Sequence, residues 1–107
     1  MSILRVVYIT VPNENVANTL ARSFVEKKLA ACVNIVSNVK SVYEWEGKLS
    51  EDNELLLIVK TQQSHLESLQ EELKQNHPYE VPEFVALPID YASEPYGKWM
   101  LEQTKNK

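Results

Sequence analysis

The apolar residues of this chain recur with a period of two in some stretches and with a helical period in others, and these periods predict its elements. Residues 3–11 are rich in β-branched and aromatic side chains, which indicates a strand that stops at Pro12. Residues 14–29 carry one apolar helical face, and Asn13 is a favourable N-cap for this helix.

Two long strand-like runs follow, and a tight turn at Glu46-Gly47 joins them. The first run covers residues 32–46, and the return strand contains Leu49 and residues 54–61. Period two assigns five apolar residues of the first run to one face: Val33, Ile35, Val39, Tyr43 and Trp45. Serines at 37 and 41 interrupt that face, which allows a bend or a bulge.

A capping box from Ser64 to Glu67 predicts the start of a second helix. Its buried stripe recurs every three or four residues and comprises Leu66, Leu69, Leu73 and, at the helix end, His77. Pro78 ends this helix, residues 84–89 form a fourth strand, and Ser93 caps a short last helix.

The element order β-α-β-β-α-β-α predicts an α+β fold. Two β-α-β units joined by a hairpin form the ferredoxin-like split β-α-β sandwich, here with a long β-hairpin and an extra C-terminal helix. A chain of 107 residues is expected to form a single domain, 1–107. Both main helices cover one sheet face, so a neighbouring subunit is the expected cover of the other.

The predicted hairpin is too long for the helix beside it. A strand over residues 32–46 spans about 50 Å at ~3.3 Å per residue. A helix over residues 14–29 spans only about 24 Å at ~1.5 Å per residue. One subunit cannot bury the far half of such a strand, and unpaired strand edges recruit other chains. The hairpin therefore predicts an oligomer.

Composition narrows the partners and the compartment. The net charge of −4 and pI near 5.2 argue against nucleic acid, which selects basic surfaces. No run of about 18 apolar residues is present, so no membrane partner is expected. The first residues lack the pattern of a secretion signal, and the single cysteine, Cys32, excludes an internal disulfide. Together these features predict a cytoplasmic location.

Candidate metal ligands are few. Cys32 and His77 carry soft or borderline donor atoms, but one chain cannot build a closed zinc site from them. Each also has a structural interpretation, Cys32 as a buried thiol and His77 as the end of a helix. Copies arranged around a symmetry axis could coordinate an ion together. Carboxylates cluster around the hairpin, where they either offer oxygen ligands to a cation or keep the hairpin soluble.

The aromatic residues have two interpretations, and enzyme motifs are missing. Tyr43 and Trp45 on the overhanging hairpin suit interface anchors or the lining of a small-ligand cleft. Only two glycines are present, so the sequence contains neither the glycine-rich motif of a phosphate-binding loop nor that of a nucleophile elbow. No nucleophile and base have motif support, and the protein is predicted not to be an enzyme.

Several motifs together resemble one family. KKLAACVNI at 27–35, SVYEWEGKL at 41–49, the E-x-x-L-x-x-K-T spacing at 54–61 and HPYEVPE at 77–83 are similar to the CutA proteins of divalent-cation tolerance. YITVP near the start and YGKWM near the end fit as well. The resemblance spans nearly the whole chain in the same order.

The resemblance implies a tight homotrimer of ferredoxin-like subunits whose architecture is similar to that of the PII signal-transduction proteins, which bind effectors between subunits. It also implies a link to copper tolerance. In some bacterial relatives the proposed copper ligands are a first-strand cysteine and two adjacent histidines. This chain has Ile9 at the first position and Asn76-His77 at the second, so only His77 is carried over.

Three hypotheses follow. The first is a trimeric, non-enzymatic protein that binds copper or another divalent cation, with His77, Cys32, Glu80 and Glu83 as candidate ligands. The second is a PII-like sensor or signalling scaffold. Its organic anion or other effector would bind in a cleft between subunits lined by Tyr43, Trp45, Lys60 and Tyr79. The third is a purely structural trimer that steadies an unknown protein partner.

Overall fold

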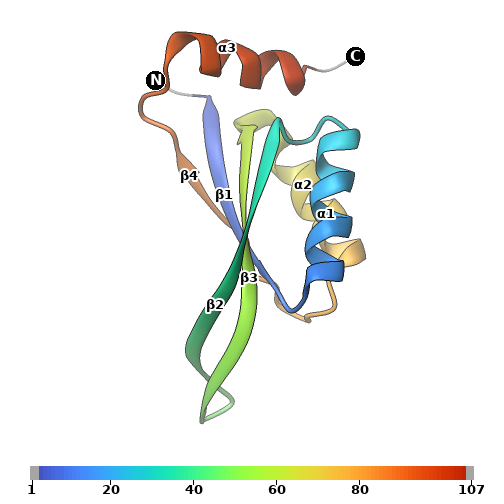
Figure 1. Cartoon of the computed structure of the whole chain (residues 1–107), viewed down its shortest axis with the longest axis vertical. Coiled ribbons are helices and arrows are strands. Elements are labelled where there is room, and N and C mark those ends of the chain that lie inside the picture. Colours follow the sequence, from blue (N-terminus) through green and yellow to red (C-terminus); the bar gives the residue numbers. More distant parts are fainter. Residues whose placement is uncertain (1–2, 106–107) are drawn as a thin grey trace.

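The computed structural model describes residues 3–105 and contains one four-stranded sheet with three helices. The chain order, with a short 3₁₀ turn at Gln63–His65, is β1 (Leu4–Val11), α1 (Glu14–Glu26), β2 (Cys32–Trp45), β3 (Lys48–Gln62), α2 (Leu66–Asn76), β4 (Val85–Pro88) and α3 (Glu94–Gln103). Neighbouring strands are antiparallel in the order β2-β3-β1-β4. Both α1 and α2 cover one face, and α3 crosses the end of the sheet (Figure 1). The ferredoxin-like α+β prediction is confirmed.

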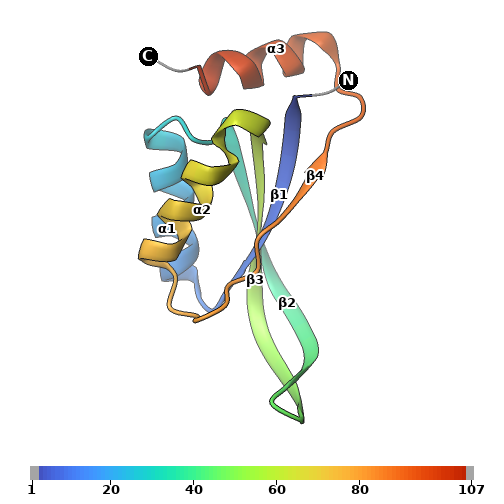
Figure 2. The ribbon, with the colours of Figure 1, turned by 180° about the vertical axis from the view of Figure 1, so that it is seen from behind.

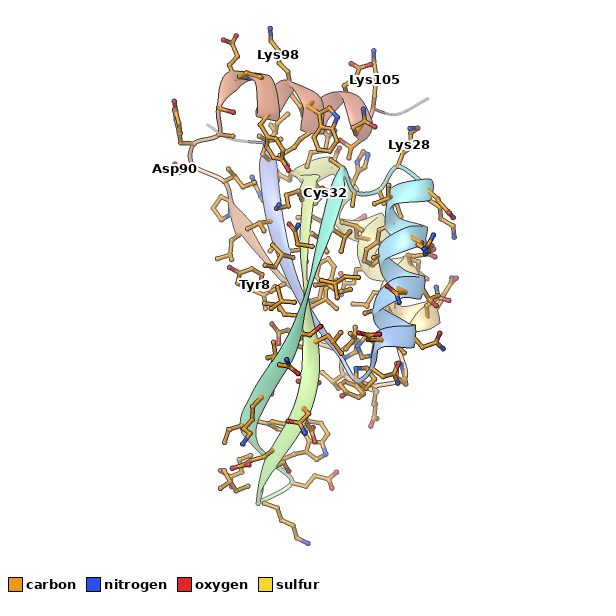
Figure 3. All side chains as sticks on the ribbon, viewed as in Figure 1. Tyr8, Lys28, Cys32, Asp90, Lys98 and Lys105 are labelled. Atoms are coloured by element: carbon orange, nitrogen blue, oxygen red, sulfur yellow. The ribbon has the colours of Figure 1, made fainter. Side chains whose placement is uncertain are left out.

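The core lies between the sheet and the two covering helices. Odd-numbered residues of β1 and β3 point into it, as a strand period of two requires. The fully buried core side chains are Val7, Ile9, Val11, Leu57 and Val59 from the sheet, Ala17, Leu20 and Phe24 from α1, and Leu69 and Leu73 from α2. Figure 3 shows the opposite orientation for Tyr8, which points away from the α1/α2 layer.

A polar cluster ties α1 to α2 at the surface. The Glu72 carboxylate accepts a hydrogen bond from the Ser23 hydroxyl at 2.5 Å and pairs with the Lys27 ammonium at 2.9 Å. These two donors hold the pKa of Glu72 below its ordinary value, the Ser23 hydroxyl contributing most. The two helices that cover the core are thereby also joined across their polar faces.

The hairpin of β2 and β3 extends well beyond the helices, as Figures 1 and 2 show from opposite sides. It makes the molecule elongated, with extents of 44 × 25 × 22 Å. The tight turn at Glu46-Gly47 is present, and both residues have positive φ, 51° and 79°. Two successive positive φ angles match the right-handed twist of the flanking strands. The predicted overhang is confirmed.

A bulge in β2 overturns one expectation about its faces. The register with β3 shifts between Val36 and Val39, and Asn38 there has a φ of 64°. One extra residue on one strand reverses the alternation beyond it. Odd residues before the bulge pair with core-facing residues of β3, whereas Tyr43 pairs with Ser50 on the other side of that strand. The prediction that all five odd apolar residues share one face is therefore wrong.

Two helix boundaries also differ from the predictions. The first helix ends at Glu26 and not at residue 29, because Lys28 takes a left-handed φ of 61°. The capping box is wrong as well: the Ser64 hydroxyl bonds to the Gln62 side chain and to His65 Nδ1, and α2 starts without a side-chain cap. Ser64 lies inside the 3₁₀ turn and cannot reach the first N–H groups of α2.

Other boundaries follow the predictions closely. Asn13 and Ser93 cap their helices by accepting hydrogen bonds from the main-chain N–H groups of Val16 and Tyr96.

The fourth strand is shorter than expected, Val85–Pro88 in place of 84–89, and all four residues are exposed. It forms one edge of the sheet, and β2 forms the other.

Candidate functional site

A hollow of about 710 Å³ opens where the hairpin leaves the body of the fold. We call it the hairpin groove. Its walls come from the end of β1, from the hairpin strands and from the segment after α2. The lining residues are Thr10, Ser41, Val42, Tyr43, Trp45, Asp52, Glu54, Tyr79, Glu80, Val81 and Glu83.

His77 anchors the segment that forms one wall of the groove. Its Nδ1 accepts a hydrogen bond from the Tyr79 main-chain N–H at 3.1 Å, so Nε2 carries the proton and donates to the Thr10 carbonyl at 2.8 Å. The ring is buried and lies 4.7 Å from the Tyr79 ring, centroid to centroid. Both nitrogens of a neutral His77 are therefore occupied, and the imidazole fixes the position of Tyr79.

Tyr79 in turn reaches a buried carboxylate on β3. Its hydroxyl donates to Glu54 Oε2 at 2.8 Å. Only 6% of the Glu54 residue surface is exposed. Burial first, and then the hydrogen bond to the anionic Glu54, raise the pKa of Tyr79 well above its ordinary value. Tyr79 thus stays neutral, and its hydroxyl retains the proton that it donates in the hydrogen bond to Glu54.

A second tyrosine–carboxylate pair lies in the same groove. The Tyr43 hydroxyl donates to Asp52 Oδ2, and this bond raises the pKa of Tyr43. Asp52 and Glu54 are two residues apart on β3 and therefore point to the same side of the strand. Among residues 3–105 the groove lining includes no lysine, arginine or histidine, so its charge is entirely negative.

The candidate metal ligands do not gather at one point. Glu80 and Glu83 line the groove, and His77 lies behind its wall. Glu83 accepts a hydrogen bond from the Thr10 hydroxyl at 3.4 Å. Cys32 pairs with Lys60, at the end of β2 far from the hairpin turn (Figure 3). Within the described part of the chain, no three His, Cys, Asp or Glu residues are arranged to hold a metal ion.

Three of the four candidate cleft residues meet in the groove: Tyr43, Trp45 and Tyr79. Lys60 does not join them. Its ammonium group donates to Asn34 Oδ1 at 2.6 Å and lies 6.0 Å from the centre of the Tyr96 ring. The structure adds Asp52 and Glu54, which belong to the carboxylate cluster that the sequence interpreted either as oxygen ligands for a cation or as charges that keep the hairpin soluble. Their spacing of two on one strand was the signal that could have singled them out.

A helix that crosses a bilayer needs about 20 mostly apolar residues in succession. No helix in residues 3–105 is long and apolar enough to do so.

Fold and groove together describe a ferredoxin-like chain with an extended hairpin. The family model "CutA1 divalent ion tolerance protein" matches residues 5–103. The chain belongs to this family.

Curated relatives extend the match. A divalent-cation tolerance protein CutA from Thermus thermophilus is 52% identical over 99 residues, covering 92% of this chain and 96% of the relative. The chloroplastic CutA of Arabidopsis thaliana is 55% identical over 101 residues, which is 94% of this chain but 56% of the relative. The chain thus spans little more than half the length of several longer relatives, such as the mouse protein at 56%.

Solved structures agree with the fold. The Cut A1 structure from Thermus thermophilus superposes with a TM-score of 0.93 at 51% identity, covering 94% of this chain and 98% of that one. CutA1 from Oryza sativa gives a TM-score of 0.94 at 48% identity, covering 99% and 98%.

Proposed function

We propose that this protein is a homotrimer without enzymatic activity that takes part in divalent-cation tolerance. It would do so by binding a divalent cation, with copper as the first candidate. The single observation that supports this proposal is the hairpin groove, where four carboxylates line one hollow and no basic side chain of residues 3–105 lines it with them. The membership in a divalent ion tolerance family points in the same direction.

The donor set supports a shared site better than one closed within a chain. Glu80 and Glu83 offer oxygen atoms, and His77 is the nearest imidazole, a ligand type that suits copper. His77 would have to release Tyr79 N–H or Thr10 O before one of its nitrogens could coordinate. We propose that a cation takes only one or two donors from each chain and that neighbouring copies complete its coordination.

The exposed surfaces support the trimer. The sheet face opposite the helices exposes apolar side chains such as Tyr8, Val36 and Leu87, each about 40% exposed. Both outer strands leave an unpaired edge, and the hairpin carries Trp45 at 50% exposure. Assembly of three copies would cover this face and the edges.

Calorimetric titration of Cu²⁺ tests the proposal. We expect the Glu80→Gln, Glu83→Gln double variant and the His77→Ala variant to bind Cu²⁺ about tenfold more weakly or worse, since each removes a donor. Cys32→Ser measures separately how much the Cys32 thiol, which lies away from the groove, contributes to Cu²⁺ affinity. Equal affinities for His77→Ala and wild type would remove His77 from the site, and equal affinities for all variants would overturn the proposal.

The shape of the groove favours a second candidate function, a PII-like small-molecule sensor. Aromatic side chains line a hollow whose size is in the usual range for small ligands, roughly 300–1,000 Å³. A thermal-shift screen discriminates, because a ligand at 100 times its dissociation constant adds about 2.7 kcal/mol of stability. A shift with metal alone favours the first function.

The proposed compartment is the cytoplasm. Relatives occupy several compartments: the Arabidopsis protein is described as chloroplastic and the one from Archaeoglobus fulgidus as periplasmic. Cell fractionation with an antibody to the native protein is the direct test.

A further inference from the structure

The hairpin groove combines buried negative charge with exposed aromatic walls. The lining carries Asp52, Glu54, Glu80 and Glu83, and no basic residue of the described chain faces them. An organic anion, the ligand first expected for this cleft, would meet four carboxylates. Lys60, the basic residue among those predicted to line this cleft, is engaged with Asn34 elsewhere.

Glu54 has one carboxylate oxygen left for a ligand. Its Oε2 accepts the Tyr79 hydroxyl, while Oε1 has no hydrogen-bond partner in residues 3–105. No buried side-chain oxygen of the described residues lacks a partner, so Oε1 is open to the groove that Glu54 lines. A nearly buried carboxylate with one neutral donor is poorly compensated, and a cation that reaches Oε1 would be strongly favoured.

The aromatic walls select the kind of cation. Trp45 is 50% exposed and Tyr43 is 40% exposed, and both line the groove. Aromatic faces attract ammonium groups within about 6 Å and also pack against hydrocarbon. They do not coordinate a metal ion, which needs several donors around one point. Aromatic walls beside carboxylates are the surroundings that an alkyl ammonium ligand prefers.

We propose that the hairpin groove binds an organic cation of the amine class, with its ammonium group on Glu54 and Asp52 and its alkyl chain against Tyr43 and Trp45. This inference rests on the second candidate function, in which the groove is a small-ligand site. It replaces an anionic effector with a cationic one because of the groove's charge. The volume of about 710 Å³ is sufficient for a flexible diamine.

A fluorescence titration tests the proposal directly. In a Trp99→Phe background Trp45 is the only tryptophan and reports on the groove. The probe is 1,4-diaminobutane, and 1,4-butanediol is the uncharged control of similar length. A chelator is present throughout, so that metal binding cannot contribute. We expect a saturable change with the diamine that weakens with added salt, and none with the diol.

Paired charge variants locate the site. Glu54→Gln keeps the shape of the side chain and should weaken diamine binding about tenfold, which is about 1.4 kcal/mol. Glu51→Gln is the matched control, because Glu51 is exposed on the same strand, lies outside the groove lining and pairs with Lys40 at 3.9 Å. Its affinity should stay within about twofold of the background. Asp52→Asn replaces Glu54→Gln if that variant fails to fold.

Three outcomes would overturn the proposal. They are equal responses to diamine and diol, equal affinities in Glu54→Gln and Glu51→Gln, or binding only after the assembled protein is dissociated. The last would mean that a basic side chain of a neighbouring copy occupies the groove. Copper titration without chelator is a separate measurement, so metal binding and amine binding can fail independently.

Discussion

At the scale of single residues, two tyrosine hydroxyls donate the same kind of hydrogen bond, to a carboxylate, in different surroundings. Tyr79 donates to Glu54, which is 6% exposed, and Tyr43 donates to Asp52 in a more open part of the groove. An unsatisfied polar group costs free energy only to the extent that water cannot replace the lost partner. Burial should therefore decide which hydroxyl matters for stability.

We predict that Tyr79→Phe lowers the free energy of unfolding by about 1–3 kcal/mol, since the buried Glu54 carboxylate loses the hydrogen bond from the Tyr79 hydroxyl. Tyr43→Phe is the matched control and should change it much less than Tyr79→Phe does, because water reaches Asp52. Urea unfolding of both variants measures the difference. Equal losses in the two variants would contradict the ranking by burial.

Alkaline pH should weaken the fold through Tyr79. Its pKa is raised in the folded state by burial and by Glu54, whereas the unfolded chain titrates at the ordinary value near 10. The stability that neutral Tyr79 contributes is complete below that value and is lost as the pH rises toward and through the raised pKa. Urea unfolding between about pH 8 and pH 11 should show this decline in wild type.

The Tyr79→Phe variant is the control for this pH dependence. Phenylalanine does not titrate. The free energy of unfolding of the variant should therefore decline less steeply above about pH 10 than that of wild type. Parallel declines in both proteins would assign the effect to other groups.

At the scale of elements, the bulge in β2 decides which side chains reach the groove. Without the extra residue near Asn38, Tyr43 and Trp45 would point to the same side as Val33 and Ile35. The bulge directs them to the side of Asp52 and Glu54, where the groove forms. A local irregularity of one residue thus separates the core half of the strand from its groove half.

We predict that Asn38→Val destabilises the fold by about 1–2 kcal/mol, because a β-branched residue is strained at a positive φ. Asn38→Gly should be close to neutral, since glycine adopts this conformation freely. Ser37→Val is the control: it is the neighbouring exposed residue, and its φ is not positive. Thermal unfolding compares the three, and an equal loss for Ser37→Val would argue against backbone strain.

At the scale of the whole molecule, the fold is covered on one side only. Both main helices pack on one sheet face, while the opposite face, β4 and the hairpin remain exposed. An apolar face and two free strand edges favour self-association. A second or third copy would also cover the open side of the hairpin groove, which lies at the base of the overhanging hairpin.

We predict that sedimentation at micromolar concentration gives three times the chain mass of 12.3 kDa. Trp45→Ala should then lower the stability of the assembled protein by about 1–3 kcal/mol, because a neighbouring copy would cover part of a ring that one chain leaves 50% exposed, while the rest of the ring lines the hairpin groove. Tyr91→Ala, at 87% exposure in the chain, serves as the control with little expected change. A stable 12-kDa species would contradict the trimer.

The sequence by itself determined the elements whose signals are local. The strand character of β1 and β3, the caps at Asn13 and Ser93 and the turn at Glu46-Gly47 depend on neighbours a few residues apart. Capping fails as a local rule at Ser64, because the 3₁₀ turn gives its hydroxyl other partners. The length of the hairpin was equally readable, since the strand-like run over residues 32–46 and the turn that follows it are both recognised from local sequence.

Only the tertiary structure decided the chemistry of the groove. His77 bonds to a carbonyl 67 residues away, and Tyr79 bonds to a carboxylate 25 residues away. Neither pairing leaves a periodic trace in the sequence, because it depends on where whole elements come to rest. The same packing turned Lys60 toward Asn34 and left Glu54 buried with no cation from residues 3–105 beside it. Local periodicity can place a residue on a face, but only the packed fold determines which distant group lies opposite it.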